Sequence, residues 1–248
     1  MTGNKRIYWI DNARAAAMIS MVIYHAMWDL VFLYGVRVPW FHSAAAFYWQ
    51  QSICWTFIFL AGFCTCFTRS VLRQGLIVSF WGLVVTLVTL VVTPQSRIIF
   101  GVLTLIGSCC LLMVLLKPFL WKVSPKVGFV VALFCFALTY RMADGYLGIF
   151  GLELIKLPSV LYSNLFTTYL GFPYAGFYSS DYFAIFPWGF LFLGGVFGGR
   201  LWVKYRPWVL ERCNKRVPVL SWLGRYSLVV YVLHQPLIYG GLSMIFYD

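Results

Sequence analysis

The sequence has 248 residues, of which 62% are hydrophobic and 10% are charged. Soluble domains are usually about one-quarter charged, and a single soluble core of this size could not bury so much apolar surface. The composition therefore excludes an ordinary soluble fold. It predicts an all-α, polytopic transmembrane helix bundle in one domain over residues 1–248. The net charge of +12 would suggest nucleic acid in a soluble protein, but its distribution follows membrane topology, as shown below.

Seven apolar segments are predicted, in chain order, to be transmembrane helices. The first, 13–34, follows basic residues but is long enough to span a bilayer and lacks a small-residue cleavage site, so we interpret it as an uncleaved helix. The others are 44–67, 75–93, 98–116, 127–140, 181–203 and 221–246. The apolar stretch 159–172 is too short to span and is predicted to be a re-entrant or interfacial piece of the long loop 141–180.

Lysine and arginine predict the orientation, because cytoplasmic loops carry an excess of both. With the N-terminus inside, Arg37, Arg97, Arg141 and Lys156 fall outside, as does the C-terminal Asp248. The other fifteen of the nineteen cations are then cytoplasmic: Lys5, Arg6, Arg14, Arg69, Arg73, Lys117, Lys122, Lys126, Arg200, Lys204, Arg206, Arg212, Lys215, Arg216 and Arg225. This distribution explains the net charge without any nucleic-acid partner.

One face of the first helix carries the best candidates for chemistry, because ionisable groups inside a membrane are costly. Arg14 and His25 are eleven residues apart, which is almost three helical turns, or about 16 Å. Asp29 follows His25 by four residues, so we expect its carboxylate to bond a ring nitrogen of His25 and fix the tautomer. The same stripe contains Asp11, Met18 and Met21. The alternative is a buried histidine tied to a neighbouring helix without chemistry.

The last helix contains a second histidine. Arg225 is expected to begin this helix at the cytoplasmic side, with His234 nine residues deeper and on the opposite face of an ideal helix. Pro236 removes a backbone hydrogen bond and is expected to kink the helix beside a cavity. The alternative is a packing kink with a satisfied histidine.

Several other residues are given structural roles. His42 is predicted to be a solvated loop residue, and Asp181 an N-cap of the sixth helix, with a ligand contact as its alternative. Two small-residue pairs, Gly194/Gly198 and Gly195/Gly199, predict close helix packing. The seven cysteines, including Cys213 in a basic loop, have no disulfide or zinc-site spacing, so we interpret them as small apolar residues and expect no metal.

Several short motifs occur along the chain: Ile10-Asp11-Asn12-Ala13-Arg14, His25 with Asp29, Phe57-Ile58-Phe59-Leu60-Ala61-Gly62, Phe186-Pro187-Trp188, Gly199-Arg200, Leu223-Gly224-Arg225-Tyr226-Ser227 and Leu233-His234-Gln235-Pro236. Together they resemble the bacterial branch of the heparan-α-glucosaminide N-acetyltransferase catalytic-domain family, within a wider superfamily of membrane acyltransferases. That family usually has Arg-Gly where this chain has Arg14-Ala15.

The resemblance implies transfer of an acyl group, expected to be acetyl, from cytoplasmic acyl-CoA to an amine or hydroxyl of an extracytoplasmic saccharide acceptor. Arg14 and Arg225 would hold the phosphates of CoA, His25 would act as general base or nucleophile with Asp29 orienting it, and His234 would be a second acid/base or oxyanion donor. The expected location is the bacterial inner (plasma) membrane as a multi-pass protein, and a homodimer stays open.

Two readings from other classes remain beside the enzyme. A small-molecule or proton-coupled transporter could use His25 and Asp29 as a relay, although the sequence has no inverted-repeat symmetry. A non-catalytic membrane subunit would keep both histidines for structure alone. Binding of acyl-CoA separates the enzyme from both.

Overall fold

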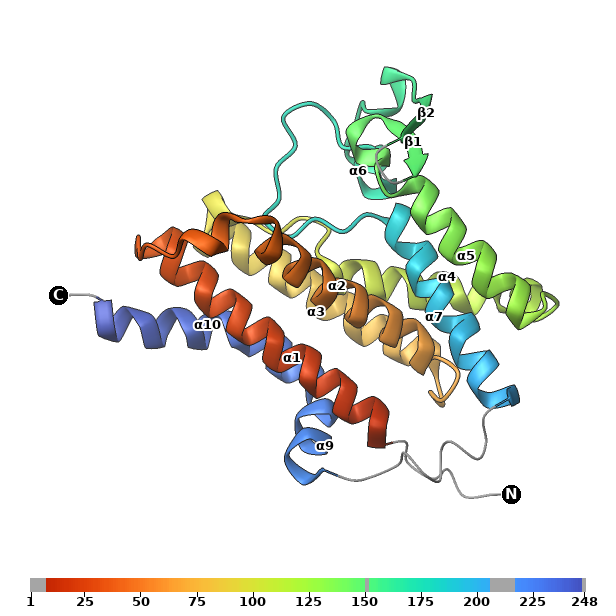
Figure 1. The fold of residues 1–248 in the computed structure, drawn as a ribbon, viewed down its shortest axis with the longest axis horizontal. Coiled ribbons are helices and arrows are strands. Elements are labelled where there is room, and N and C mark those ends of the chain that lie inside the picture. Colours follow the sequence, from red (N-terminus) through yellow and green to blue (C-terminus); the bar gives the residue numbers. More distant parts are fainter. Residues whose placement is uncertain (1–7, 150–151, 206–216, 247–248) are drawn as a thin grey trace. The chain divides into compact units, whose positions relative to one another are not determined.

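The computed structural model describes residues 8–149, 152–205 and 217–246, and these form a helical bundle with one short hairpin (Figure 1). The predicted all-α, membrane-type fold is confirmed. Several residues named above lie outside the described residues: Lys5, Arg6, Arg206, Arg212, Cys213, Lys215, Arg216 and Asp248.

Five helical segments of the described chain are long and apolar enough to cross a membrane: Tyr8–Leu33, Val71–Val92, Val102–Leu120, Pro125–Asp144 and Ser227–Phe246. Two more of the predicted spans correspond to helices of 21 residues, α2 (Ala44–Cys64) and α7 (Ile185–Tyr205), which are not in this set. The count of seven spans and the sides of the termini therefore stay predictions.

The chain divides into two compact units. The terminal unit combines Met1–Phe57 with Arg206–Asp248, and the central unit is Ile58–Tyr205. The terminal unit thus brings the first and last helices together, and it contains all five residues predicted to carry the chemistry. Its described elements are α1 (Tyr8–Trp28), the π-helical turn η1 (Asp29–Leu33), the 3-10 turn η2 (Pro39–His42), the first part of α2, α9 (Pro218–Arg225) and α10 (Ser227–Phe246).

Helix α10 runs parallel to α1 and is tied to it along its length (Figure 1). At one end the Ser221 hydroxyl of α9 donates to the Asn12 side-chain oxygen at 3.3 Å. At the other, the Tyr34 hydroxyl is hydrogen-bonded to that of Ser243 at 3.0 Å. Both pairs are 209 residues apart, so the two segments keep one register from end to end.

Helix α9 packs on the start of α1 through a glycine. A Cβ built on Gly224 would overlap the backbone carbonyl of Asp11, so only glycine permits this approach. The helix ends at Arg225, and Tyr226 has non-helical backbone angles. The predicted single helix over 221–246 is therefore two helices, and Arg225 ends the first of them instead of beginning the second.

An aromatic cluster fixes the other end of α1. The ring of Tyr24 lies 5.2 Å from those of both Phe41 and Trp49, and the Trp49 indole N–H donates to the Ser20 hydroxyl at 2.7 Å. His42, beside this cluster, is exposed as predicted. These contacts hold α1, η2 and the start of α2 together.

Helix ends in the central unit follow ordinary capping chemistry. The Ser70 side chain accepts from the Arg73 N–H at 3.2 Å, and the short α6 (Leu165–Leu170) begins with a reciprocal Asn164/Thr167 capping box. The unit's remaining helices are α3 (Val71–Val92), α4 (Val102–Leu120), α5 (Pro125–Thr139) and α7.

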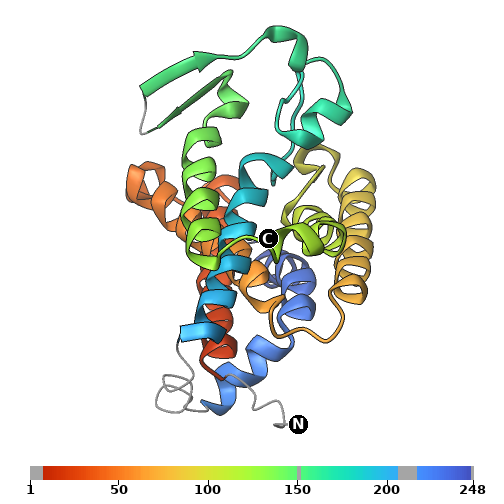
Figure 2. The same cartoon turned by 90° about the vertical axis from the view of Figure 1, so that its right-hand side faces the viewer.

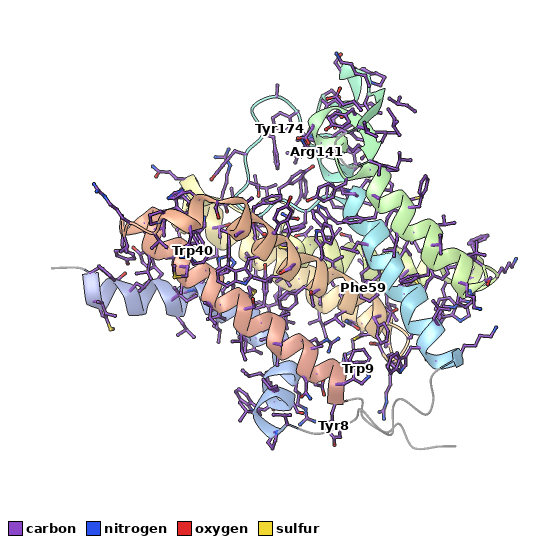
Figure 3. The ribbon with its side chains drawn as sticks, viewed as in Figure 1. Tyr8, Trp9, Trp40, Phe59, Arg141 and Tyr174 are labelled. Atoms are coloured by element: carbon purple, nitrogen blue, oxygen red, sulfur yellow. The ribbon has the colours of Figure 1, made fainter. Side chains whose placement is uncertain are left out.

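The glycines of α7 allow close packing, as predicted. Added Cβ atoms on Gly195 and Gly199 would overlap the backbone carbonyl oxygens of Phe59 and Phe63 in α2. Phe59 therefore lies directly against α7, and its side chain is labelled in Figure 3. The small-residue spacing here needs no chemical explanation.

A β-hairpin, not expected from the sequence, follows α5. Strands β1 (Tyr146–Ile149) and β2 (Leu152–Lys156) pair antiparallel and continue from the end of α5 (Figure 2). At the base of the hairpin, Arg141 Nε lies 3.0 Å from the Tyr146 hydroxyl and 2.9 Å from the Asp144 carboxylate (Figure 3). In place of one re-entrant piece over 159–172, the structure has the 3-10 turn η5 (Ser159–Leu161) and α6.

Asp181 caps a different helix from the one predicted. Its carboxylate accepts from the Val102 N–H at 3.2 Å, at the first turn of α4, whereas α7 does not begin until Ile185. The cap function predicted from the sequence is present, but it acts across the fold, because the segment before α7 passes beside Gly101.

Candidate functional site

The two buried histidines of the terminal unit lie together. The ring centres of His25 in α1 and His234 in α10 are 4.8 Å apart, and the ring planes are inclined by 63°. Their separation along the chain is the same 209 residues that joins the two hydrogen-bonded pairs at the ends of these helices. The parallel register of α1 and α10 therefore positions the pair.

His25 lies on the predicted stripe, because α1 is an unbroken α-helix from Tyr8 to Trp28. Asp11, Met18 and Met21 on the same stripe are buried, so this face points into the protein. Neither ring nitrogen of His25 has a hydrogen-bond partner among the residues that the structure describes; its recorded neighbours are the rings of Tyr24 and His234.

His234 is held in one tautomer by its own helix. Its Nδ1 lies 2.5 Å from the carbonyl oxygen of Tyr231. Because a carbonyl oxygen only accepts, Nδ1 carries the hydrogen, and Nε2 of the neutral ring is left with its lone pair free. Nε2 is buried and has no partner in the described part of the chain. His234 can therefore take up a proton at Nε2.

Asp29 does not bond His25, contrary to the sequence-based expectation. Its carboxylate, only 1% exposed, accepts from the side-chain N–H₂ of Gln235, with Nε2 at 2.9 Å and 3.0 Å from its two oxygens. No hydrogen bond joins Asp29 to His25 within the described residues. The carboxylate thus orients the residue next to His234.

The backbone does not move Asp29 off the stripe. The backbone at Trp28 is still α-helical, and the π-helical turn η1 displaces only the residues that follow Asp29. The difference lies in the partner: Gln235 of α10 offers an N–H₂ donor to both oxygens of the carboxylate.

Gln235 is a member of the site that we did not predict. The sequence contains a signal for it, since a glutamine between a histidine and a proline in an apolar helix is a costly polar group at membrane depth. Its Oε1 is buried and has no partner among the described residues.

The two predicted phosphate-binding arginines lie towards the opposite end of α1. Arg225 is exposed and directly follows Gly224, which contacts the backbone of Asp11. Arg14, half-buried, is the next stripe residue after Asp11. Both arginines are thus at the end where α9 meets α1, and Arg14 is about 16 Å along the helix axis from His25. The opposite-face relation predicted between Arg225 and His234 does not apply, because the helix is broken at Tyr226.

The site therefore combines cations at one end of a helix pair with two imidazoles deeper along the same pair. Arginine guanidinium groups suit phosphates, and an imidazole with a free nitrogen suits proton transfer or nucleophilic attack. In the described chain no group of three or more His, Cys, Asp or Glu residues could hold a metal ion.

Comparison with known families identifies one match. A family model described as heparan-α-glucosaminide N-acetyltransferase, catalytic, matches residues 6–236. The matched range includes every residue of the site described above. Curated proteins and solved structures give no match to this chain.

Proposed function

Since the chain belongs to the heparan-α-glucosaminide N-acetyltransferase catalytic family, and is thus a multi-pass membrane acetyltransferase by type, we propose that it moves an acyl group across the plasma membrane. The donor is cytoplasmic acyl-CoA, with acetyl as the expected group. The acceptor is an amine or hydroxyl of an extracytoplasmic saccharide.

The observation that carries this proposal is the pairing of His25 with His234, whose ring centres are 4.8 Å apart. Arg14 lies on the same helix as His25. The distance of about 16 Å from Arg14 to His25 along the axis is comparable to the length of the pantetheine arm of CoA. Phosphates bound by Arg14 and Arg225 would therefore place the thioester beside the two imidazoles.

The chemical step needs one base and one acid. The acceptor nitrogen or oxygen attacks the thioester carbonyl carbon while an imidazole nitrogen of His25 takes its proton. The tetrahedral intermediate then expels the thiolate sulfur as the C–S bond breaks, and the proton passes from the imidazolium to sulfur. The products are the acylated acceptor and free CoA, and His25 returns to its neutral form.

A covalent route is the second form of the same proposal. A ring nitrogen of neutral His25 attacks the thioester carbonyl carbon and the C–S bond breaks. The proton on the other ring nitrogen of His25 passes to the sulfur, so that CoA leaves as the thiol. The acceptor then attacks the acyl-imidazole while Nε2 of His234 takes its proton. The bond between the acyl carbon and the His25 nitrogen breaks, and that proton passes to the released imidazole. The ring nitrogens of His25, which bond to none of the described residues, support either route.

The experiment uses purified protein in lipid nanodiscs with radiolabelled acetyl-CoA and two probes, glucosamine and methyl glucoside. The first offers an amine and hydroxyls, and the second only hydroxyls. Labelled sugar is the expected product, and label retained on protein without acceptor would identify the covalent route. Absence of both acetyl-CoA binding and transfer would reject the enzyme and favour a transporter or structural subunit.

A further inference from the structure

Two buried hydrogen-bond acceptors lie on adjacent residues of α10. Nε2 of His234 and Oε1 of Gln235 are both buried and both lack a partner among the described residues. Buried polar atoms in folded proteins are almost always hydrogen-bonded, so such a pair calls for an explanation. Neither atom is needed to hold the helices together, because each side chain makes its structural bond through its other polar atom.

The amide of Gln235 is fixed in orientation. A carboxylate accepts hydrogen bonds and cannot donate them, so Asp29 selects the rotamer in which the N–H₂ of Gln235 faces it. The amide oxygen must then point the other way. With an uncharged, symmetric partner in place of Asp29, either end of the amide could face α1.

We propose that Gln235 binds the acyl acceptor: its Oε1 accepts a hydrogen bond from an N–H or O–H of that substrate, and Asp29 is the positioning residue that keeps this oxygen turned away from α1. The inference rests on the acyltransferase function proposed above and adds a residue that recognises the acceptor. A ligand that brings hydrogen-bond donors, as amines and sugar hydroxyls do, complements unpaired acceptors on two consecutive residues.

The test compares two double variants that both carry the substitution Asp29→Asn. In Asp29→Asn/Gln235→Glu, the amide introduced at position 29 can donate to one oxygen of the new carboxylate, and the other oxygen still faces the substrate. In Asp29→Asn/Gln235→Met, a side chain of similar length offers no oxygen. The two proteins therefore differ in the acceptor atom at position 235 and in the charge of the glutamate, which replaces the negative charge that wild type carries at position 29. Neither leaves Asp29 as an unpaired buried charge.

We expect the methionine variant to raise KM for the sugar acceptor about tenfold over the glutamate variant, as loss of one buried hydrogen bond would. KM for acetyl-CoA should be equal in the two. The single variant Asp29→Asn keeps a hydrogen bond between the two side-chain amides of α1 and α10 but lets the Gln235 amide flip. Because about half of the molecules would then present the oxygen, KM for the acceptor should rise about twofold. This variant carries the test if the methionine protein does not fold.

A matched control removes a different hydrogen bond between the α1 segment and α10. Tyr34→Phe deletes the hydrogen bond to Ser243 at the far end of α10 and should leave both KM values unchanged. Equal acceptor KM values in the two double variants, or in Asp29→Asn and wild type, would overturn the role of Gln235 while leaving the acyltransferase standing. A wild-type protein that transfers no label to glucosamine or methyl glucoside would overturn the proposed function and this inference with it.

Discussion

His25 and His234 face each other at the same offset of 209 residues that pairs Asn12 with Ser221 and Tyr34 with Ser243. One parallel register between the first and last helices thus sets three contacts along the terminal unit. Displacing α10 by one helical turn would break the Tyr34–Ser243 hydrogen bond and separate the imidazoles.

Removing the first imidazole should abolish transfer. His25→Ala is expected to lower the rate of labelled-acetyl transfer by about 10²-fold or more, because general acid–base catalysis contributes about 10²–10⁴-fold. The measurement is initial rate in nanodiscs at equal protein, with size-exclusion profile and helical circular dichroism as controls for folding. Retained activity in a folded variant would remove His25 from the mechanism.

Neutralising the arginines should weaken donor binding in particular. Arg14→Gln is expected to raise KM for acetyl-CoA about tenfold, as expected for loss of a hydrogen bond to a charged group. Arg225→Gln, at a more exposed position, should raise KM for acetyl-CoA by less. Arg73→Gln is the control, since Arg73 is another predicted cytoplasmic cation but lies at the start of α3. An equal effect of all three substitutions would indicate general attraction by positive charge and no specific site.

The contact between α9 and α1 should not tolerate even a methyl group. Gly224→Ala places Cβ against the Asp11 carbonyl and is expected to destabilise the protein by about 1–3 kcal/mol, read as a lower Tm in a thermal unfolding assay. Gly240→Ala, in α10, meets no atom within 4 Å and should be neutral or stabilising by up to about 1 kcal/mol. A neutral Gly224→Ala would contradict the close approach.

The cap on α4 should depend on an oxygen and not on a charge. Asp181→Ala is expected to lower stability by about 1 kcal/mol, because the Val102 N–H loses its acceptor. Asp181→Asn retains an oxygen at the same place and should recover most of that loss. If alanine and asparagine reduce Tm equally, the negative charge of Asp181 is what matters.

The helices were predictable because long apolar runs bounded by polar residues have few alternatives in a membrane. The stripe on α1 was predictable for the same reason, since it depends only on α-helical periodicity up to Trp28. The glycine pairs of α7 were interpreted correctly because small residues at a four-residue spacing mark close packing.

The rest depends on contacts between distant residues. Nothing in the spacing of the first helix reveals that Gln235 of α10 offers a donor, so the partner of the Asp29 carboxylate was predicted wrongly. The break at Tyr226 is equally hidden in an apolar run, and the hairpin after α5 lacks a strong strand pattern. Both histidines were singled out from the sequence, but only the packing of α10 on α1 shows that they form a pair.

The terminal unit draws its chain from both ends of the sequence, with the central unit between them. During translation, His25 leaves the ribosome before His234 has been synthesised. The first helix is therefore in the membrane without its partner while roughly 200 residues are added, which takes on the order of ten seconds or more at about 5–20 residues per second. The histidine pair can therefore form only after α10 has been made. On the proposed function, a ribosome that stalls before α9 would release a chain with the first imidazole and without the second.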